Sequence, residues 1–150
     1  MGFFSDLFKD FKDDKGELRG EFEARRETIK VYDHCILPRY NEHWSDTGKY
    51  TSHRDEVFMW FDADDVSELK YSSNVISDVI VKEATPDEDG IMQIVLSKNH
   101  NIFAPLCSYA PGNPEVDRTC YAFSYEQNKA ALNLQEFIRG RLKANGLLGK

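Results

Sequence analysis

The middle of the chain consists of short apolar runs, rich in β-branched and aromatic residues, separated by polar segments. This pattern is typical of β-strands joined by turns. The clearest hairpin signal is TPDEDG, which lies between VISDVIVKEA and IMQIVLSKN, because Pro, Asp and Gly favour tight turns. Further strands are predicted in ETIKVYDHCILPRY, in EVFMWF, after the acidic turn of DADDVSELKYSS, and as an antiparallel pair in NIFAPLCSY and TCYAFSY.

Near the C-terminus the apolar spacing becomes helical. Ser124 and Gln127 stand in a capping-box arrangement, in which Ser124 accepts a hydrogen bond from the Gln127 amide. Asn145 and Gly146 supply a C-terminal stop. The sequence therefore predicts one amphipathic helix that packs across an open end of the sheet through Leu134, Phe137, Ile138 and Leu142.

A shorter amphipathic helix is predicted at the N-terminus, in GFFSDLFKDFK. Its apolar stripe has to be buried, because exposing several phenylalanines to water would be a liability. Three surfaces can bury it: its own sheet, another protein subunit or a membrane. The acidic excess of the segment disfavours the membrane. The stripe consists of Phe3, Phe4, Leu7, Phe8 and Phe11.

The chain is expected to form one domain preceded by a leader, since its 150 residues match an ordinary domain size. Residues 1–26 contain the predicted helix and the charged stretch DDKGELRGEFEARRE, which is interpreted as a second helix or a linker. Residues 27–150 contain the predicted strands and the terminal helix. The expected fold class is α+β.

Charge narrows the range of partners. The formal net charge is −7, from 26 acidic and 19 basic side chains. Nucleic-acid binding depends mainly on Lys and Arg contacts to phosphate, so nucleic acid is not an expected partner. Anionic lipid surfaces are disfavoured for the same reason, whereas basic protein partners stay open.

The cysteines and the start of the chain indicate a cytoplasmic protein. The first residues lack a basic segment followed by a long apolar core, and no apolar run approaches the roughly 18 residues of a membrane-spanning helix. Cytoplasmic thiols are normally reduced. Cys107 and Cys120 flank a predicted hairpin loop, so a disulfide between them stays geometrically open beside the expected pair of buried thiols.

Candidate chemistry is sparse. The acidic turn with Asp62, Asp64, Asp65 and Glu68 lacks the pattern of a calcium loop. The spacing of His34, Cys35, His43 and His53 matches no familiar zinc site. Nucleophile elbows, phosphate-binding glycine loops and paired metal-binding histidines are also missing from the sequence. We therefore expect no catalytic residues, no metal and no cofactor.

Surface recognition is the more promising class of function. Large aromatic residues in polar loops are favoured anchors of protein interfaces. Trp44 and Tyr50 lie in the polar stretch NEHWSDTGKYTSHRD, whereas Trp60 lies in an apolar strand and is expected in the core. The predicted partner-binding residues are Phe4, Leu7, Phe8, Phe11, Trp44 and Tyr50.

Several segments resemble bacterial pleckstrin-homology-like (PH-like) domain proteins. TIKVYDHCIL is similar to their first core strands, VFMWFDADDVSELKY to their apolar strand and acidic turn, and CYAFSYEQNKAALNLQEFIRGRL to their closing strand and capping helix. MGFFSDLF also looks like the helical leader of several members. The resemblance implies a bent antiparallel sheet barrel over residues 27–150, plugged at one end by the C-terminal helix.

In that family the usual role is to bind protein, peptide or lipid, without catalysis. Phosphoinositide-binding members carry three basic residues around the first hairpin. Here Lys30 and Arg39 fit the first two positions, but Asn41 occupies the third, which argues against inositol phosphates. The binding of other small molecules is left undecided by the sequence.

Three function hypotheses follow. The first is a non-enzymatic PH-like binding or scaffolding module that self-associates. The second is an acidic inhibitor or immunity-type protein that neutralises a basic toxin or nuclease. The third is an unrecognised hydrolase, in which a His, a Cys or Ser and an Asp would converge in space.

Overall fold

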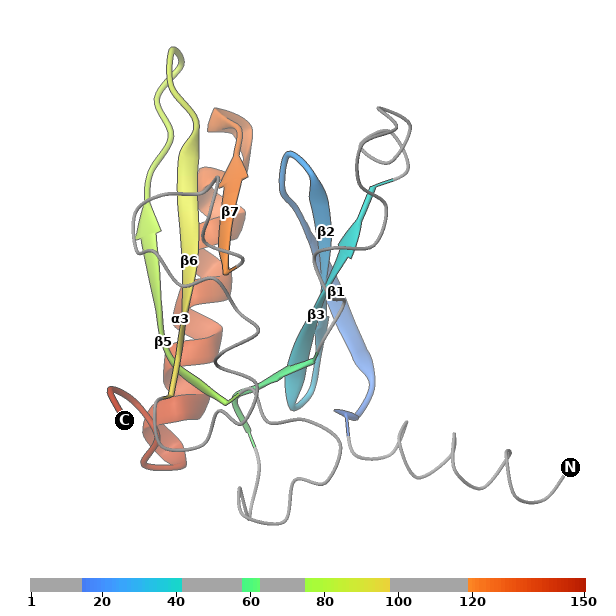
Figure 1. The fold of residues 1–150 in the computed structure, drawn as a ribbon, viewed down its shortest axis with the longest axis vertical. Coiled ribbons are helices and arrows are strands. Elements are labelled where there is room, and N and C mark those ends of the chain that lie inside the picture. Colours follow the sequence, from blue (N-terminus) through green and yellow to red (C-terminus); the bar gives the residue numbers. More distant parts are fainter. Residues whose placement is uncertain (1–14, 42–57, 63–74, 98–118) are drawn as a thin grey trace, which may run out of the picture.

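The computed structural model describes residues 15–41, 58–62, 75–97 and 119–150. These residues form two antiparallel sheets and one C-terminal helix (Figure 1). The four-stranded sheet contains β1 (Leu18–Glu23), β2 (Glu27–Tyr32), β3 (Cys35–Tyr40) and β4 (Met59–Trp60). The three-stranded sheet contains β5 (Ile76–Lys82), β6 (Gly90–Leu96) and β7 (Cys120–Phe123), and the chain ends with η3 (Tyr125–Gln127) and α3 (Asn128–Ala144).

The predicted hairpin at TPDEDG is confirmed, and one segment predicted as strand forms a second hairpin. The segment ETIKVYDHCILPRY forms β2 and β3, which pair antiparallel across a turn at Asp33 and His34. The segment TPDEDG separates β5 from β6, and Thr85 and Glu88 form the bridge that closes this turn. Pro38 lies within β3, beyond the two residues of that strand that pair with β4.

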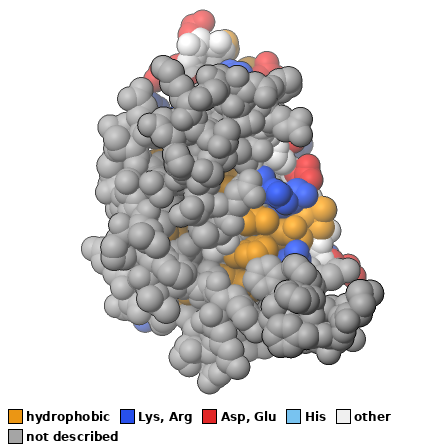
Figure 2. All heavy atoms as spheres, turned by 45° about the vertical axis from the view of Figure 1, so that its right-hand side comes forward, with side chains coloured by type: hydrophobic (Ala, Val, Ile, Leu, Met, Phe, Trp, Pro, Cys, Tyr) orange, Lys and Arg blue, Asp and Glu red, His pale blue; other side chains and the backbone are white. Residues whose placement is uncertain are grey.

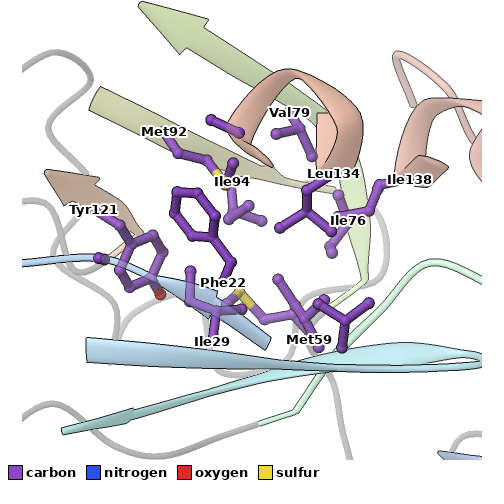
Figure 3. Close-up of a cluster of buried hydrophobic side chains, with 14 of the residues drawn as sticks. Phe22, Ile29, Met59, Ile76, Val79, Met92, Ile94, Tyr121, Leu134 and Ile138 are labelled. Atoms are coloured by element: carbon purple, nitrogen blue, oxygen red, sulfur yellow. The ribbon is translucent and has the colours of Figure 1, made fainter. Parts of the chain in front are cut away.

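The core lies between the two sheets and α3 (Figure 3). Leu134 and Ile138 project from α3 toward Phe22 of the first sheet and Ile76 of the second. The partly buried Phe137 packs at the border of this cluster. The predicted helix and its inward apolar face are thereby confirmed. The buried residues of the helix are Ala131, Leu134, Ile138 and Leu142.

The two ends of α3 differ in how well the sequence predicted them. The capping box is wrong: the Gln127 amide donates to the backbone carbonyl of Ser124 at 2.9 Å, and α3 begins only after the short η3 turn. The C-terminal stop is confirmed. Gly146 has a φ of +68°, its N–H donates to the Lys143 carbonyl, and the Leu147 N–H donates to the Leu142 carbonyl at 2.8 Å. This is the Schellman pattern, in which glycine adopts the left-handed conformation without a steric penalty.

The charged stretch before residue 27 is in part a strand. Our interpretation of it as a helix or linker is wrong for β1, which pairs along its length with β2. Phe22 is the one residue of β1 that is buried, so the segment carries almost no apolar pattern of its own and depends on β2 for its conformation. The predicted boundary between residues 26 and 27 falls inside the β1–β2 hairpin.

The described residues form two sheets and no closed barrel. Among the described residues, two backbone contacts join the sheets. Trp60 and Val75 form an isolated parallel bridge, and the Arg25 N–H in the β1–β2 turn donates to the Ala122 carbonyl of β7 at 2.8 Å. β7 itself pairs with β6.

Several predicted features lie outside the described residues. They include the N-terminal helix, the strand in NIFAPLCSY, the strand after the acidic turn, and Cys107. These stay predictions, as does the expected relation between Cys107 and Cys120. Cys120 itself is buried in β7.

Candidate functional site

All six predicted partner-binding residues lie outside the part of the chain that the structure describes. The candidate site is therefore built here from the described residues, beginning with the edges of the two sheets. An exposed strand edge presents unpaired backbone N–H and C=O groups, and these groups can pair with another chain. The outermost strands are β1 and β4 in the first sheet and β5 and β7 in the second. β4 has only two residues, and β7 accepts the Arg25 N–H at Ala122, so the comparison here is between β1 and β5.

The C-terminal helix and tail cover the free edge of β5. The Asn128 side chain and the backbone of Ala84 exchange two hydrogen bonds, of 2.7 and 2.8 Å. Further along, Gln135 Nε2 donates to the Val79 carbonyl at 2.8 Å. The Gly149 N–H donates to the Ser77 carbonyl, also at 2.8 Å. Polar groups of the same chain thus bond to this edge at Ser77 and Val79 and, just beyond the strand, at Ala84, which leaves little room for an added strand.

No described residue pairs with the outer edge of β1. All residues of β1 except Phe22 are exposed. Among the described residues, β1 has hydrogen-bonded strand pairing on one side alone, with β2. β1 is also long enough, at six residues, to pair with an added segment.

The turn between β1 and β2 determines which backbone groups point outward. The Ala24 N–H donates to the Glu27 carbonyl at 2.9 Å, so these two residues form the hydrogen-bonded pair that closes the hairpin. In an antiparallel ladder, hydrogen-bonded and non-hydrogen-bonded pairs alternate. Phe22 therefore directs its N–H and C=O toward β2, whereas Glu21 and Glu23 direct theirs toward the open edge.

Both ends of β1 are held in place. At its start, the Glu17 N–H donates to Asp33 Oδ2 at 2.8 Å, and the Arg19 guanidinium forms an ion pair with the same carboxylate. The hydrogen bonds from the Glu17 N–H and from Arg19 hold the pKa of Asp33 below its ordinary value. Beyond its end, Arg25 forms a bidentate ion pair with Asp89, at 2.8 and 3.1 Å. An edge held at both ends loses little conformational freedom on binding.

Two of the four exposed side chains along β1 are acidic, and the other two are those of Leu18 and Arg19. The Arg19 charge is already paired with Asp33. Glu21 lies across the sheet from Lys30, and Glu23 lies across from Thr28, whose hydroxyl is 3.3 Å from the Glu23 carboxylate. Because side chains alternate between the faces of a strand, Glu21 and Glu23 share the face opposite to the buried Phe22. Sequence reasoning missed this site, although the alternation Glu-Phe-Glu around Phe22 is a short period-two signal.

The outward face of the first sheet also carries an apolar cluster, formed by Tyr32, Cys35, Leu37 and Trp60 with Phe58 packed against it. The Lys15 ammonium lies 4.6 Å from the centroid of the Tyr32 ring and 5.6 Å from that of Phe58. Figure 2 shows hydrophobic side chains beside Lys and Arg side chains on this side of the molecule. Burial raises the pKa of the Cys35 thiol to about 12, so this thiol is protonated at neutral pH and suited to packing.

A polar cluster joins β4 to the end of α3. Asp62 accepts hydrogen bonds from the Arg141 guanidinium and from Asn145 Nδ2, the latter at 2.8 Å. Burial acts to raise the pKa of Asp62, but the hydrogen bonds from Asn145 and Arg141 outweigh it and hold this pKa below its ordinary value. His34 Nδ1 lies 3.4 Å from Asp62 Oδ2 and makes no hydrogen bond. These polar contacts hold the end of β4 against the end of α3, and each charged group in the cluster has an oppositely charged group nearby.

Within the described residues, no group of three His, Cys, Asp or Glu side chains is arranged to hold a metal ion. In the same residues, no helix is long and apolar enough to cross a membrane. Comparisons of the chain with protein-family models, with curated proteins and with solved structures find no match.

Proposed function

We propose that this chain is a non-enzymatic binding or scaffolding module of PH-like type. Its binding surface is the open edge of β1, which takes up an extended segment of another polypeptide. Backbone hydrogen bonds supply the affinity in this mode of recognition, and side chains at alternate positions supply the specificity. We place the protein in the cytoplasm, with a protein as its partner.

The order of elements supports the PH-like assignment. Four strands form the first sheet, three form the second, and one amphipathic helix follows. The helix inserts Leu134 and Ile138 between the sheets, as expected for a helix that plugs one end of a bent sheet. Asn41, which stands in place of the third basic residue of a phosphoinositide site, has its side chain 2.8 Å from the Thr28 hydroxyl and turned to the sheet.

The observation that carries the binding proposal is the contrast between the two edges. β5 is covered by Asn128, Gln135 and Gly149. β1 is exposed and held at both ends, and the backbone groups of Glu21 and Glu23 turn outward. Among the described residues β1 has no such cover, and its protection against pairing is limited to the irregularity between Leu18 and Gly20 and to the charges of Glu21 and Glu23.

The N-terminal apolar stripe is a second predicted association element. Phe4, Leu7, Phe8 and Phe11 are proposed to pack on another protein chain, with self-association as the expected outcome. Trp44 and Tyr50 are proposed as additional contacts. These residues lie outside the described part of the chain, so the proposal for the β1 edge does not draw on them.

Partner capture from a lysate of the native host, followed by mass spectrometry, tests the β1 edge when two variants are compared. Glu21→Pro removes the outward N–H and is tolerated at a strand edge, whereas Glu21→Gln removes the same charge but keeps the N–H. Capture should fall much further with Glu21→Pro than with Glu21→Gln, while circular dichroism shows both variants folded. Equal capture by the two folded variants would contradict binding through the β1 edge.

A further inference from the structure

We infer that the segment that pairs with β1 is a basic strand, with Lys or Arg at alternate positions and apolar residues between them. This inference rests on the proposed function, because it names the chemistry of the partner at the same edge. It follows from the charges of Glu21 and Glu23, from the alternation of side chains between the two faces of β1, and from the space beside Gly20.

The negative charges of Glu21 and Glu23 determine which side chains fit on the outward face of the added strand. Glu21 and Glu23 are exposed, and their side chains share one face of the sheet. Residues of an added strand that lie opposite them would face the same way, two positions apart. Opposite charges across neighbouring strands stabilise the pairing, and like charges destabilise it. The complementary strand therefore carries two basic side chains at alternate positions.

The core-facing side of β1 determines which residues fit between the two basic residues of the added strand. Phe22 points into the core and is 3% exposed. On the same side, a Cβ added at Gly20 would meet no atom of the described residues within 4 Å. A residue opposite Gly20 can therefore be large, and an apolar side chain there would cover the border of the core beside Phe22. For antiparallel pairing, the partner segment reads basic, apolar, basic, large apolar in chain order.

A second copy of β1 is a poor occupant of this edge. When two β1 strands pair antiparallel about Phe22, Glu21 of one chain lies opposite Glu23 of the other. When they pair about Glu21, the two Glu21 side chains face each other. When they pair about Gly20, Arg19 meets Glu21, but Arg19 is already paired with Asp33 and lies at the irregularity in β1. Like charges or a lost ion pair accompany each of these registers.

The probe is a synthetic peptide in which Lys-Val-Lys-Phe is flanked by Ser and Gly residues. Two matched peptides control for charge and for spacing: Glu-Val-Glu-Phe, and Lys-Lys-Val-Phe, which keeps the charge but breaks the alternation. Binding to the full chain is measured by fluorescence anisotropy at low and high salt. Hydrogen exchange of the Glu21 and Glu23 amides locates the peptide on the molecule.

The expected result is saturable binding of the alternating lysine peptide, with slowed exchange of the Glu21 and Glu23 amides. The double variant Glu21→Lys and Glu23→Lys should weaken this binding by about tenfold or more, because two attractions become repulsions. The matched control is Glu83→Lys with Glu136→Lys, which changes the charge equally at exposed positions away from β1. This control should leave binding almost unchanged.

Three outcomes would overturn the inference: equal binding of either control peptide, insensitivity to reversal of Glu21 and Glu23, or a dimer in light scattering with protected β1 amides. Failure of the peptide can be told apart from failure of the proposed function. If Glu21→Pro still abolishes partner capture when Glu21→Gln does not, the edge binds a segment of different chemistry. If that difference is absent as well, the β1 edge is not the binding surface.

Discussion

Asp62 shows how one side chain joins distant parts of this chain. It follows β4, yet its carboxylate accepts hydrogen bonds from Arg141 and Asn145 at the end of α3. The backbone carbonyl of His34 also accepts the N–H groups of Phe61 and Asp62, at 3.1 and 3.3 Å. The β2–β3 turn, β4 and α3 therefore meet at one carboxylate.

The pH dependence of stability should report this junction. The folded-state pKa of Asp62 lies below its ordinary value of 3.8, so its stabilisation is present above that pH and is lost as the pH falls through the folded-state pKa. Asp62→Asn should lower the free energy of unfolding by about 1 kcal/mol at neutral pH and by less near pH 3. Urea unfolding at both values measures this, with Asp87→Asn in an exposed turn as the control. An unchanged difference at the lower pH would count against a role for the carboxylate charge.

Two glycines should respond in opposite directions to alanine. A Cβ at Gly90 would lie 2.5 Å from the Phe123 ring and 2.6 Å from the Lys82 carbonyl oxygen, whereas one at Gly140 would meet nothing within 4 Å in the part of the chain that the structure describes. Gly90→Ala should therefore destabilise the protein by about 1–3 kcal/mol through overpacking. Gly140→Ala should stabilise it by about 0.5–1 kcal/mol, because it removes glycine from a helix interior. Thermal and urea unfolding of both variants test this pair, and destabilisation of similar size in both would contradict it.

At the scale of elements, α3 both fills the core and covers the edge of β5. Asn128 presents its side-chain amide to Ala84 in the way that a neighbouring strand would. Asn128→Ala should destabilise the fold by about 1–3 kcal/mol, because the N–H and C=O of Ala84 lose their partners. Asn128→Asp keeps the acceptor but faces the Ala84 carbonyl with an oxygen, so it should not restore stability. Full stability of Asn128→Asp would show that the donated hydrogen bond is unimportant.

The inward face of α3 should be most sensitive at Ile138. Ile138 is fully buried, so Ile138→Ala should lower the free energy of unfolding by about 2–5 kcal/mol. Phe137 is only partly buried, with its ring 5.7 Å from Phe61 and the Arg141 guanidinium 5.2 Å from its centroid. A fully buried ring would lose about 3–5 kcal/mol on truncation to alanine. Because Phe137 is only partly buried, Phe137→Ala should cost less than Ile138→Ala. Urea unfolding ranks the two variants, and the reverse order would contradict this packing.

At the scale of the whole molecule, the N-terminal stripe and the two-sheet body should be separable. Removing residues 1–12 should leave the body folded, because its described core is formed by the two sheets and α3. If Phe4, Leu7, Phe8 and Phe11 mediate association, the same deletion should lower the apparent mass in light scattering. Unfolding of the shortened protein would instead assign the stripe to the core.

The sequence alone predicted the elements whose patterns are local. The helical period of α3, its stop at Gly146 and the turn between β5 and β6 all depend on residues close together in the chain, and each is confirmed. The inward face of α3 was predicted for the same reason, since a helix with one apolar stripe has to bury that stripe.

Only the tertiary structure revealed the features that depend on distant partners. β1 carries one buried residue, so its strand conformation comes from pairing with β2. The predicted capping box does not form, because the Gln127 amide donates to the backbone carbonyl of Ser124 and not to its side chain. The identities of Ser124 and Gln127 do not distinguish between these two acceptors. The contrast between the covered edge of β5 and the open edge of β1 also comes from the tertiary structure. It depends on contacts that span 44 and 56 positions of the chain, and no local pattern records which strand edge a distant helix will cover.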